Sequence, residues 1–170
     1  MKYVKRTEIM GFLNTTPTDK TANWGLVGRG MTTGTYTYDA SESSDTDIIH
    51  DTSSTEVEGY SINLDSEMKC IYGDPIYDFI NDLRLKLAVH DEATTQFLGV
   101  DKYMTTKSDA FRAQLFDCSI SIKSYGGDGG ATPTIGFKIN LNGDPKNGTV
   151  TLTDGKPVFT ETNVSATASK

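Results

Sequence analysis

Apolar and polar residues alternate along much of the chain with the period of two that half-buried β-strands show. In the clearest example, polar residues separate Phe116, Cys118, Ile120 and Ile122. Similar alternation, or a run of β-branched and aromatic residues, predicts further strands. Glycine-rich turns at 125–130 and 143–148 are expected to reverse the chain between the later ones. The expected strands cover residues 9–13, 32–39, 55–64, 68–72, 94–104, 110–123, 134–141, 149–153 and 157–160.

One segment changes to a helical period. Its apolar residues recur at spacings of three and four, which places them on one stripe of a helix. The Asp74 carboxylate can accept hydrogen bonds from the free amides of the first turn, and Pro75 suits the first helical position. We therefore expect a helix from Pro75 to about Ala88 that packs on the sheet. The stripe comprises Ile76, Phe79, Ile80, Leu83 and Leu87.

These elements predict a mainly β protein: an antiparallel β-sandwich or barrel with one flanking α-helix. A chain of 170 residues is long enough for one core, so we expect a single domain over residues 1–170. Trp24 is the only tryptophan, and we expect it to anchor the core rather than to serve as a ligand platform. Cys70 and Cys118 fall in predicted strands, which favours reduced core thiols over a disulfide or a metal site.

Negative charge is concentrated in a long polar hairpin at about residues 39–59. The formal net charge is -7, and the hairpin contains seven acidic residues and no lysine or arginine, so it accounts for the whole imbalance. Two adjacent apolar residues, Ile48 and Ile49, lie among these acids. The segment is either a solvated flexible loop or a surface that meets a partner, and the two isoleucines favour the partner. The acids are Asp39, Glu42, Asp45, Asp47, Asp51, Glu56 and Glu58.

Both ends of the chain read as extensions of the domain. Residues 1–7 form an N-terminal arm with three basic side chains, Lys2, Lys5 and Arg6. Residues 161–170 offer nothing to bury, so we expect a flexible C-terminal tail. The acidic balance disfavours a grip on DNA or on an anionic membrane surface, and we find no signal peptide or membrane-spanning stretch. We expect a soluble protein made in a cytoplasm.

Catalytic and metal-binding patterns are weak. The two histidines, His50 and His90, have no HExxH or CxxC companion. Asp45, Asp47 and Glu56 match three positions of an EF-hand loop, but an isoleucine and a histidine occupy positions that need a ligand and a glycine. No nucleotide-binding glycine pattern or GxSxG elbow occurs. We expect no catalytic residue, no metal and no cofactor.

The order of several short segments is more informative than any one of them. Trp24-Gly-Leu-Val-Gly28 precedes a Thr/Tyr strand and the long polar hairpin, which returns through Val57-Glu-Gly-Tyr60. Gly73-Asp-Pro75 opens the helix, and the later strands are followed by Tyr125-Gly-Gly-Asp-Gly-Gly130 and Ile139-Asn-Leu-Asn-Gly-Asp-Pro145. In this order the chain resembles the major tail proteins, or tail tube proteins, of long-tailed (siphovirus-type) phages of Gram-positive bacteria.

The resemblance implies a structural protein of the virion tail that assembles in the host cytoplasm. Six copies would form a ring, rings would stack into a tube, and DNA would pass through during ejection without specific binding. Besides itself, its implied partners are the tape measure protein, the tail terminator and the tail tip or distal tail proteins. The implied stacking element is the hairpin, with its seven acids, Ile48 and Ile49. We hypothesise that the acids pair with Lys2, Lys5 and Arg6 of the next ring.

Two other interpretations stay open. A soluble β-sandwich could bind a carbohydrate, with the strand that carries Tyr36 and Tyr38 as its platform. A hydrolase is a weaker alternative, because no acid–base pair with an evident pocket can be recognised in the sequence.

Overall fold

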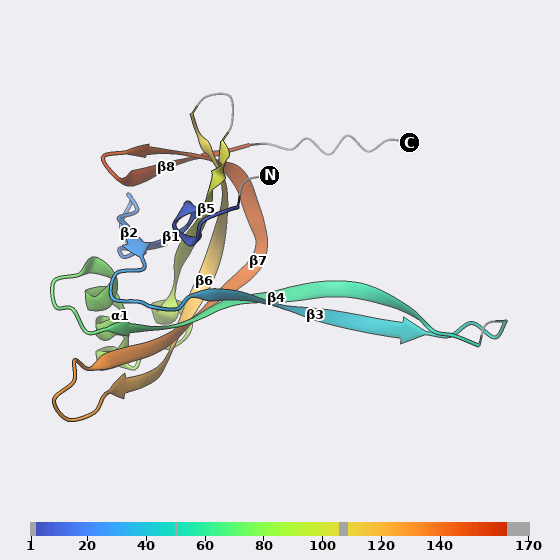
Figure 1. Ribbon diagram of the computed structural model, residues 1–170, viewed down its shortest axis with the longest axis horizontal. Helices are drawn as coiled ribbons and strands as arrows, with labels where there is room; N and C mark the ends of the chain where they lie inside the picture. The colour runs from blue at the N-terminus through green and yellow to red at the C-terminus, as the bar shows by residue number, and fades with distance from the viewer. Residues whose placement is uncertain (1–2, 50, 106–108, 163–170) are drawn as a thin grey trace.

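The computed structural model describes residues 3–49, 51–105 and 109–162. Within them, eight antiparallel strands form one sheet with the order β2-β1-β5-β6-β7-β4-β3, and β8 pairs with the end of β7 (Figure 1). The expected fold, mainly antiparallel β with one α-helix, is confirmed. The strands are β1 (Ile9–Asn14), β2 (Trp24–Val27), β3 (Thr35–Asp45), β4 (Ser54–Lys69), β5 (Thr94–Thr105), β6 (Phe111–Gly126), β7 (Thr134–Thr153) and β8 (Lys156–Glu161). The helix is α1 (Pro75–Lys86), and two 3₁₀ turns, η1 (Arg6–Glu8) and η2 (His90–Ala93), precede β1 and β5.

The sheet curves around a main core. Leu13 of β1 and Leu64 of β4 belong to the same buried cluster, although three strands separate β1 from β4 in the sheet. The rings of Tyr36 on β3 and Phe97 on β5 meet edge to face, with their centroids 6.1 Å apart. Strands that are distant in the sheet therefore face each other, as in a barrel.

Helix α1 closes one side of the main core. The Asp74 carboxylate accepts hydrogen bonds from the backbone amides of Ile76 (3.1 Å) and Tyr77 (3.2 Å), as its place before Pro75 predicts. Ile76, Ile80 and Leu83 of the predicted stripe are buried, and Phe79 is half-buried against them.

The last member of the predicted stripe is an exception. Leu87 is 81 % exposed, because the helix ends at Lys86 and Leu87 adopts a left-handed backbone with φ 50°. The helical spacing that would direct its side chain to the core stops one residue earlier. Tyr77, outside the predicted stripe, is buried instead.

A second core lies on the opposite face of β1 and β5. Phe12 and Leu98 are buried there, whereas their neighbours Leu13 and Phe97 point into the main core. Val150 of β7 is buried in this second cluster, and Trp24 packs against it half-buried. β1 and β5 are thus covered on both faces.

Several expected strand limits are wrong. The expected turn at 143–148 is a bulge inside the continuous strand β7, because the long strand β6 offers pairing partners before and after it. The strands expected at 55–64 and 68–72 are one strand, β4, which ends at Lys69. The expected tail also begins too early: Glu161 pairs with Gly148, and the amide of Thr162 donates to the carbonyl of Asn147. The rest of the tail, 163–170, lies outside the described residues.

Both cysteines are free thiols, as expected. Cys118 is buried in the main core, and burial raises the pKa of its thiol to about 12. Cys70 is half-buried and packs against the same core.

We predict that Asp74→Ala lowers the free energy of unfolding by about 1 kcal/mol, because two amides of the first helical turn lose their acceptor. Urea denaturation followed by circular dichroism measures this change. Asp74→Ser, which keeps a side-chain oxygen at the cap, should retain most of the stability. Equal losses in both variants would contradict the capping role.

Candidate assembly surfaces

A two-stranded arm projects from the body of the protein (Figure 1). We define the arm as residues 39–61, the outer parts of β3 and β4 with the loop between them. β4 pairs with β7 only from Ile62 onward, so the arm strands pair with each other alone. None of the described residues of the arm is buried. Such a ribbon is at best marginally stable in water, which suggests that its surface meets another molecule.

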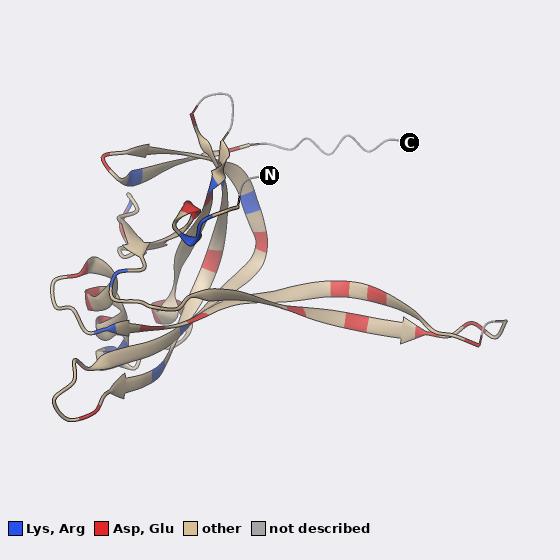
Figure 2. Cartoon of the chain, in the orientation of Figure 1, with Lys and Arg blue, Asp and Glu red and all other residues tan. Residues whose placement is uncertain are grey.

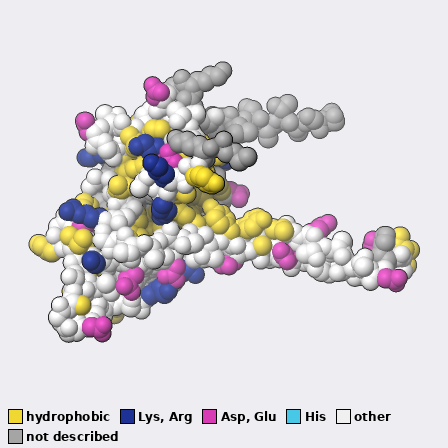
Figure 3. Space-filling model, viewed as in Figure 1, with side chains coloured by type: hydrophobic (Ala, Val, Ile, Leu, Met, Phe, Trp, Pro, Cys, Tyr) yellow, Lys and Arg dark blue, Asp and Glu magenta, His cyan; other side chains and the backbone are white. Residues whose placement is uncertain are grey.

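One face of the arm and its root is apolar. Residues directly opposite in an antiparallel pair lie on the same face, so the pairs Tyr38–Ile62 and Ala40–Tyr60 share a face. A register shift in the strand pairing skips Glu58, which has no residue opposite it. Val57 therefore pairs with Glu42 and lies on the same face as the tyrosines. Tyr38 is 61 % exposed and Tyr60 63 % exposed. Hydrophobic side chains accordingly gather over the root of the arm in the space-filling view (Figure 3).

The predicted acidic residues are distributed along the whole arm without an intervening lysine or arginine (Figure 2). Asp39, Glu56 and Asp45 lie on the face opposite the tyrosines, as the strand pairing requires. A carboxylate oxygen of Asp39 accepts a hydrogen bond from the amide of Asn63 at 3.4 Å. The acids therefore do not form one patch: three line the polar face, Glu42 lies on the apolar face, Glu58 lies at the register shift, and Asp47 and Asp51 belong to the loop.

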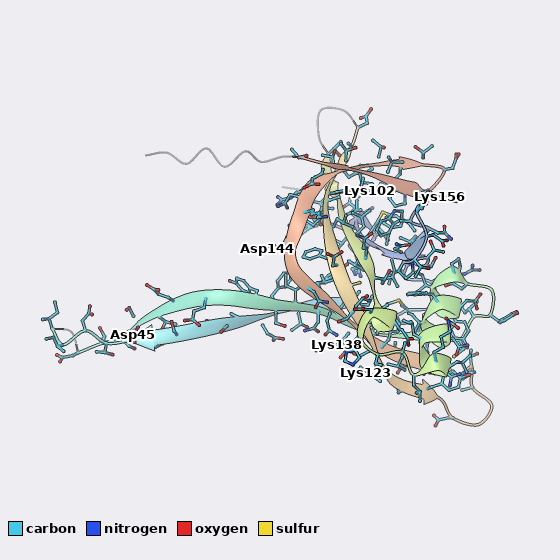
Figure 4. The ribbon with its side chains drawn as sticks, turned by 180° about the vertical axis from the view of Figure 1, so that it is seen from behind. Asp45, Lys102, Lys123, Lys138, Asp144 and Lys156 are labelled. Atoms are coloured by element: carbon cyan, nitrogen blue, oxygen red, sulfur yellow. The ribbon has the colours of Figure 1, made fainter. Side chains whose placement is uncertain are left out.

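The tip of the arm combines apolar and acidic side chains. Ile48 is fully exposed and Ile49 is 80 % exposed, and Asp47 and Asp51 lie beside them in the loop. Asp45 ends β3 at the outer part of the arm, as the labelled side chains show (Figure 4). His50 lies outside the described residues. Two exposed isoleucines at the end of a projecting ribbon form a surface suited to burial by a partner.

The basic N-terminal segment is attached to its own chain. The Arg6 guanidinium donates hydrogen bonds to the carbonyls of Ile9 (2.6 Å) and Gly34 (3.1 Å). The nearby phenol of Tyr36 has its pKa raised to about 12 by burial, and Arg6 opposes that rise. Two of the five donors of Arg6 are thus used within its own chain, and its pairing with the acidic hairpin stays a prediction. Lys5 is exposed, and its pairing with the hairpin stays a prediction; Lys2 lies outside the described residues.

The sheet also presents a continuous polar face. In β3, β4, β7 and β6, the residues of the main core alternate with polar ones across four paired strands. One row across these strands is Thr37, Asn63, Asn140 and Ser119. On the adjoining row, Asp65 forms an ion pair at 2.5 Å with Lys123, which lies at the register shift between Ile122 and Ser124 of β6. Helix α1 packs on the opposite, apolar face. On the polar face Thr37 and Asp65 are exposed, Asn140 and Ser119 are half-buried, and Asn63 is buried.

Among the described residues, no group of three or more His, Cys, Asp or Glu side chains could hold a metal ion. In the same part of the chain, no helix has the length and apolar character needed to cross a membrane.

Comparison with known proteins gives a structural match only. No protein-family model and no curated protein sequence matches the chain. A solved structure described as the tail of an empty GTA particle, obtained by helical refinement with C6 symmetry, superimposes with a TM-score of 0.61. The two chains share one fold. The match covers 84 % of this chain and 97 % of the tail chain, at 11 % sequence identity.

The predicted stacking surface of the arm omits its aromatic part. Tyr38, Tyr60 and Val57 are exposed on one face, but the sequence analysis assigns only the acids and the two isoleucines of the arm to stacking. The sequence contains a signal for this face: in 36–40 and in 60–64, tyrosine or aliphatic residues alternate with polar ones. This pattern predicts a strand face, and the exposure of Tyr38, Tyr60 and Val57 in the described structure shows that the face is open.

We predict that amide hydrogens of the arm exchange faster than those of β4 between Asn63 and Lys69 in the unassembled protein. The arm is paired on one side only, and none of its described side chains is buried. In contrast, β4 pairs with β7 from Ile62 to Lys69 and buries Leu64, Ser66 and Met68. Hydrogen exchange read by mass spectrometry measures both segments in one sample. Equal protection would mean that something in the isolated protein already supports the arm.

Proposed function

We propose that this protein builds the tube of a phage-type tail, as rings of six copies that stack around an open channel. The observation that carries the proposal is the unsupported arm, with its exposed apolar face, on a fold shared with a C6-symmetric tail. The number six is taken from that tail and applied to this chain by structural analogy. The tape measure, terminator and tip proteins stay partners by resemblance.

Ring formation is supported by two open strand edges in the four-stranded part of the sheet. β3 pairs only with β4, and residues 120–126 of β6 pair only with β7 within the described chain. Unpaired edges are templates for a neighbouring chain, and natural proteins rarely leave them bare. Because the two edges differ, a contact between them is heterologous and closes a ring if the rotation per copy allows it.

The polar sheet face is suited to line the channel. The face carries many short polar side chains, and its charged members include both acids and lysines, such as Asp65 paired with Lys123. A conduit for DNA must not retain it, and every lysine or arginine that contacts a phosphate strengthens binding in a salt-dependent way. A face with few cations, in a protein of net charge -7, favours passage over binding.

Stacking is assigned to the arm. Its apolar face and its tip would be buried against the next ring, which would supply the support that the ribbon lacks in one copy. The acids then add orientation and specificity rather than most of the affinity.

We predict that the purified protein forms rings or tubes with a central hole in negative-stain micrographs. Replacement of residues 43–56 by Asn-Gly should leave a folded protein that forms no long tubes. The exchange joins Glu42 to Val57, which are already opposite each other, through a two-residue hairpin turn. Circular dichroism and thermal unfolding check the fold.

A matched control is Ser61→Ala, a small change on the polar face at the root of the arm. It should assemble like the unmodified protein. If the shortened variant formed tubes of normal length, the arm would not be the stacking element. If the unmodified protein formed neither rings nor tubes under any condition, the tail-tube proposal itself would fail.

The carbohydrate-binding alternative loses one ring of its predicted platform. Tyr36 is half-buried against Phe97, so only Tyr38 of the two predicted tyrosines is open to a ligand. The other exposed ring on this face is Tyr60 of β4, so a sugar platform would have to combine two strands of the arm.

A further inference from the structure

A groove beside the C-terminal end of α1 is lined mainly by apolar side chains. It has a volume of about 480 Å³ and lies between the last helical turn and residues 120–125 of β6. Leu83, Leu87 and Ala88 line it from the helix side, and Ile120, Ile122 and Tyr125 from the strand side. Leu87 is exposed because of its left-handed conformation, so the fold keeps an aliphatic side chain at the rim. Among the described residues nothing covers this groove.

Cationic groups surround the apolar floor. Arg84 stacks on the ring of Tyr125 with its guanidinium carbon 3.8 Å from the ring centroid, and Lys123 also lines the groove. Lys123 pairs with Asp65 of its own chain at 2.5 Å, and this pair is solvent-exposed. Exposed pairs contribute little to stability and can exchange partners easily.

The tip of the arm has the complementary chemistry. It presents two exposed isoleucines flanked by Asp45, Asp47 and Asp51, which matches an apolar floor with a cationic rim. Another groove, of about 410 Å³ between β1, β2 and the start of β3, is less suitable. Its one cationic side chain, Arg6, already donates to two backbone carbonyls.

We propose that the arm tip of one copy inserts Ile48 and Ile49 into the groove beside α1 of a second copy. The inference rests on the proposed tail-tube function and names the surface that receives the arm. Helix α1 lies at the opposite side of the molecule from the arm tip (Figure 1). A contact between opposite ends is head to tail, and repetition of such a contact builds a stack of unlimited length.

The test compares Leu87→Asp with Leu85→Asp. Both leucines are exposed on the same helix end, but only Leu87 lines the groove. Leu87→Asp should raise the concentration needed for tube formation at least about tenfold, because it removes apolar area and repels the acidic tip. Leu85→Asp should change it by less than about twofold. Light scattering and micrographs measure assembly, and thermal unfolding checks that both variants fold.

Mixing gives a second readout. The double variant Ile48→Asp/Ile49→Asp has a defective tip and an intact groove, whereas Leu87→Asp has the reverse. Each alone should yield single rings, and a mixture of the two preassembled ring samples should yield pairs of rings without longer tubes. Only a head-to-tail contact between tip and groove predicts this product. Single rings only, or long tubes, in the mixture would overturn the proposal.

Cross-linking covers the case in which assembly is weak. Ile49→Cys mixed with Leu87→Cys should give an oxidised dimer well above the background of the unmodified protein with its two native cysteines. Ile49→Cys mixed with Val158→Cys, an exposed position on β8, is the control and should give only that background. Equal yields would overturn the docking site.

The site and the proposed function can fail separately. If Leu87→Asp formed tubes as readily as the unmodified protein does, the docking site alone would be refuted. If the unmodified protein formed neither rings nor tubes, the proposed function would be refuted.

Discussion

The long antiparallel pair β6–β7 is the element on which both cores depend. Residues of its inner half, such as Ile120 and Ile139, bury their side chains with α1 in the main core. The outer half contributes Val150 to the second core, on the opposite face of β1 and β5. The bulge between these halves lets one strand serve both cores, because it shifts the register and bends the ribbon without breaking the pairing.

This construction leaves the outer parts of β3 and β4 without support. β7 pairs with β4 only as far as Ile62, so within the described part of the chain the ribbon beyond it has neither a third strand nor a covering helix. A two-stranded ribbon of this kind gains stability when another surface covers it. The arm, the groove beside α1 and the two open strand edges are all surfaces that one copy cannot bury by itself. Their coexistence in one small fold is the physical reason to expect an assembly.

Local physical rules accounted for much of the fold. Asp74 and Pro75 identified the helix start, since capping and proline geometry depend only on neighbouring residues. The alternation in 116–122 and 134–141 identified the strands of the main core. The same rules failed at 143–148, where glycine, proline and asparagine indicated a turn. A bulge has a similar composition, and only the strand beside it decides whether the chain reverses or continues.

The sequence by itself determined the acidity of the arm, the two isoleucines at its tip and the start of the helix, because these are properties of adjacent residues. The tertiary structure decided which residues are covered. Tyr36 and Tyr38 occupy equivalent positions in the same strand pattern, yet Tyr36 packs on Phe97 while Tyr38 stays open. A period of two specifies the face on which a side chain lies. How deeply that face is buried depends on the strand or helix that packs against it, and that partner comes from a distant part of the chain.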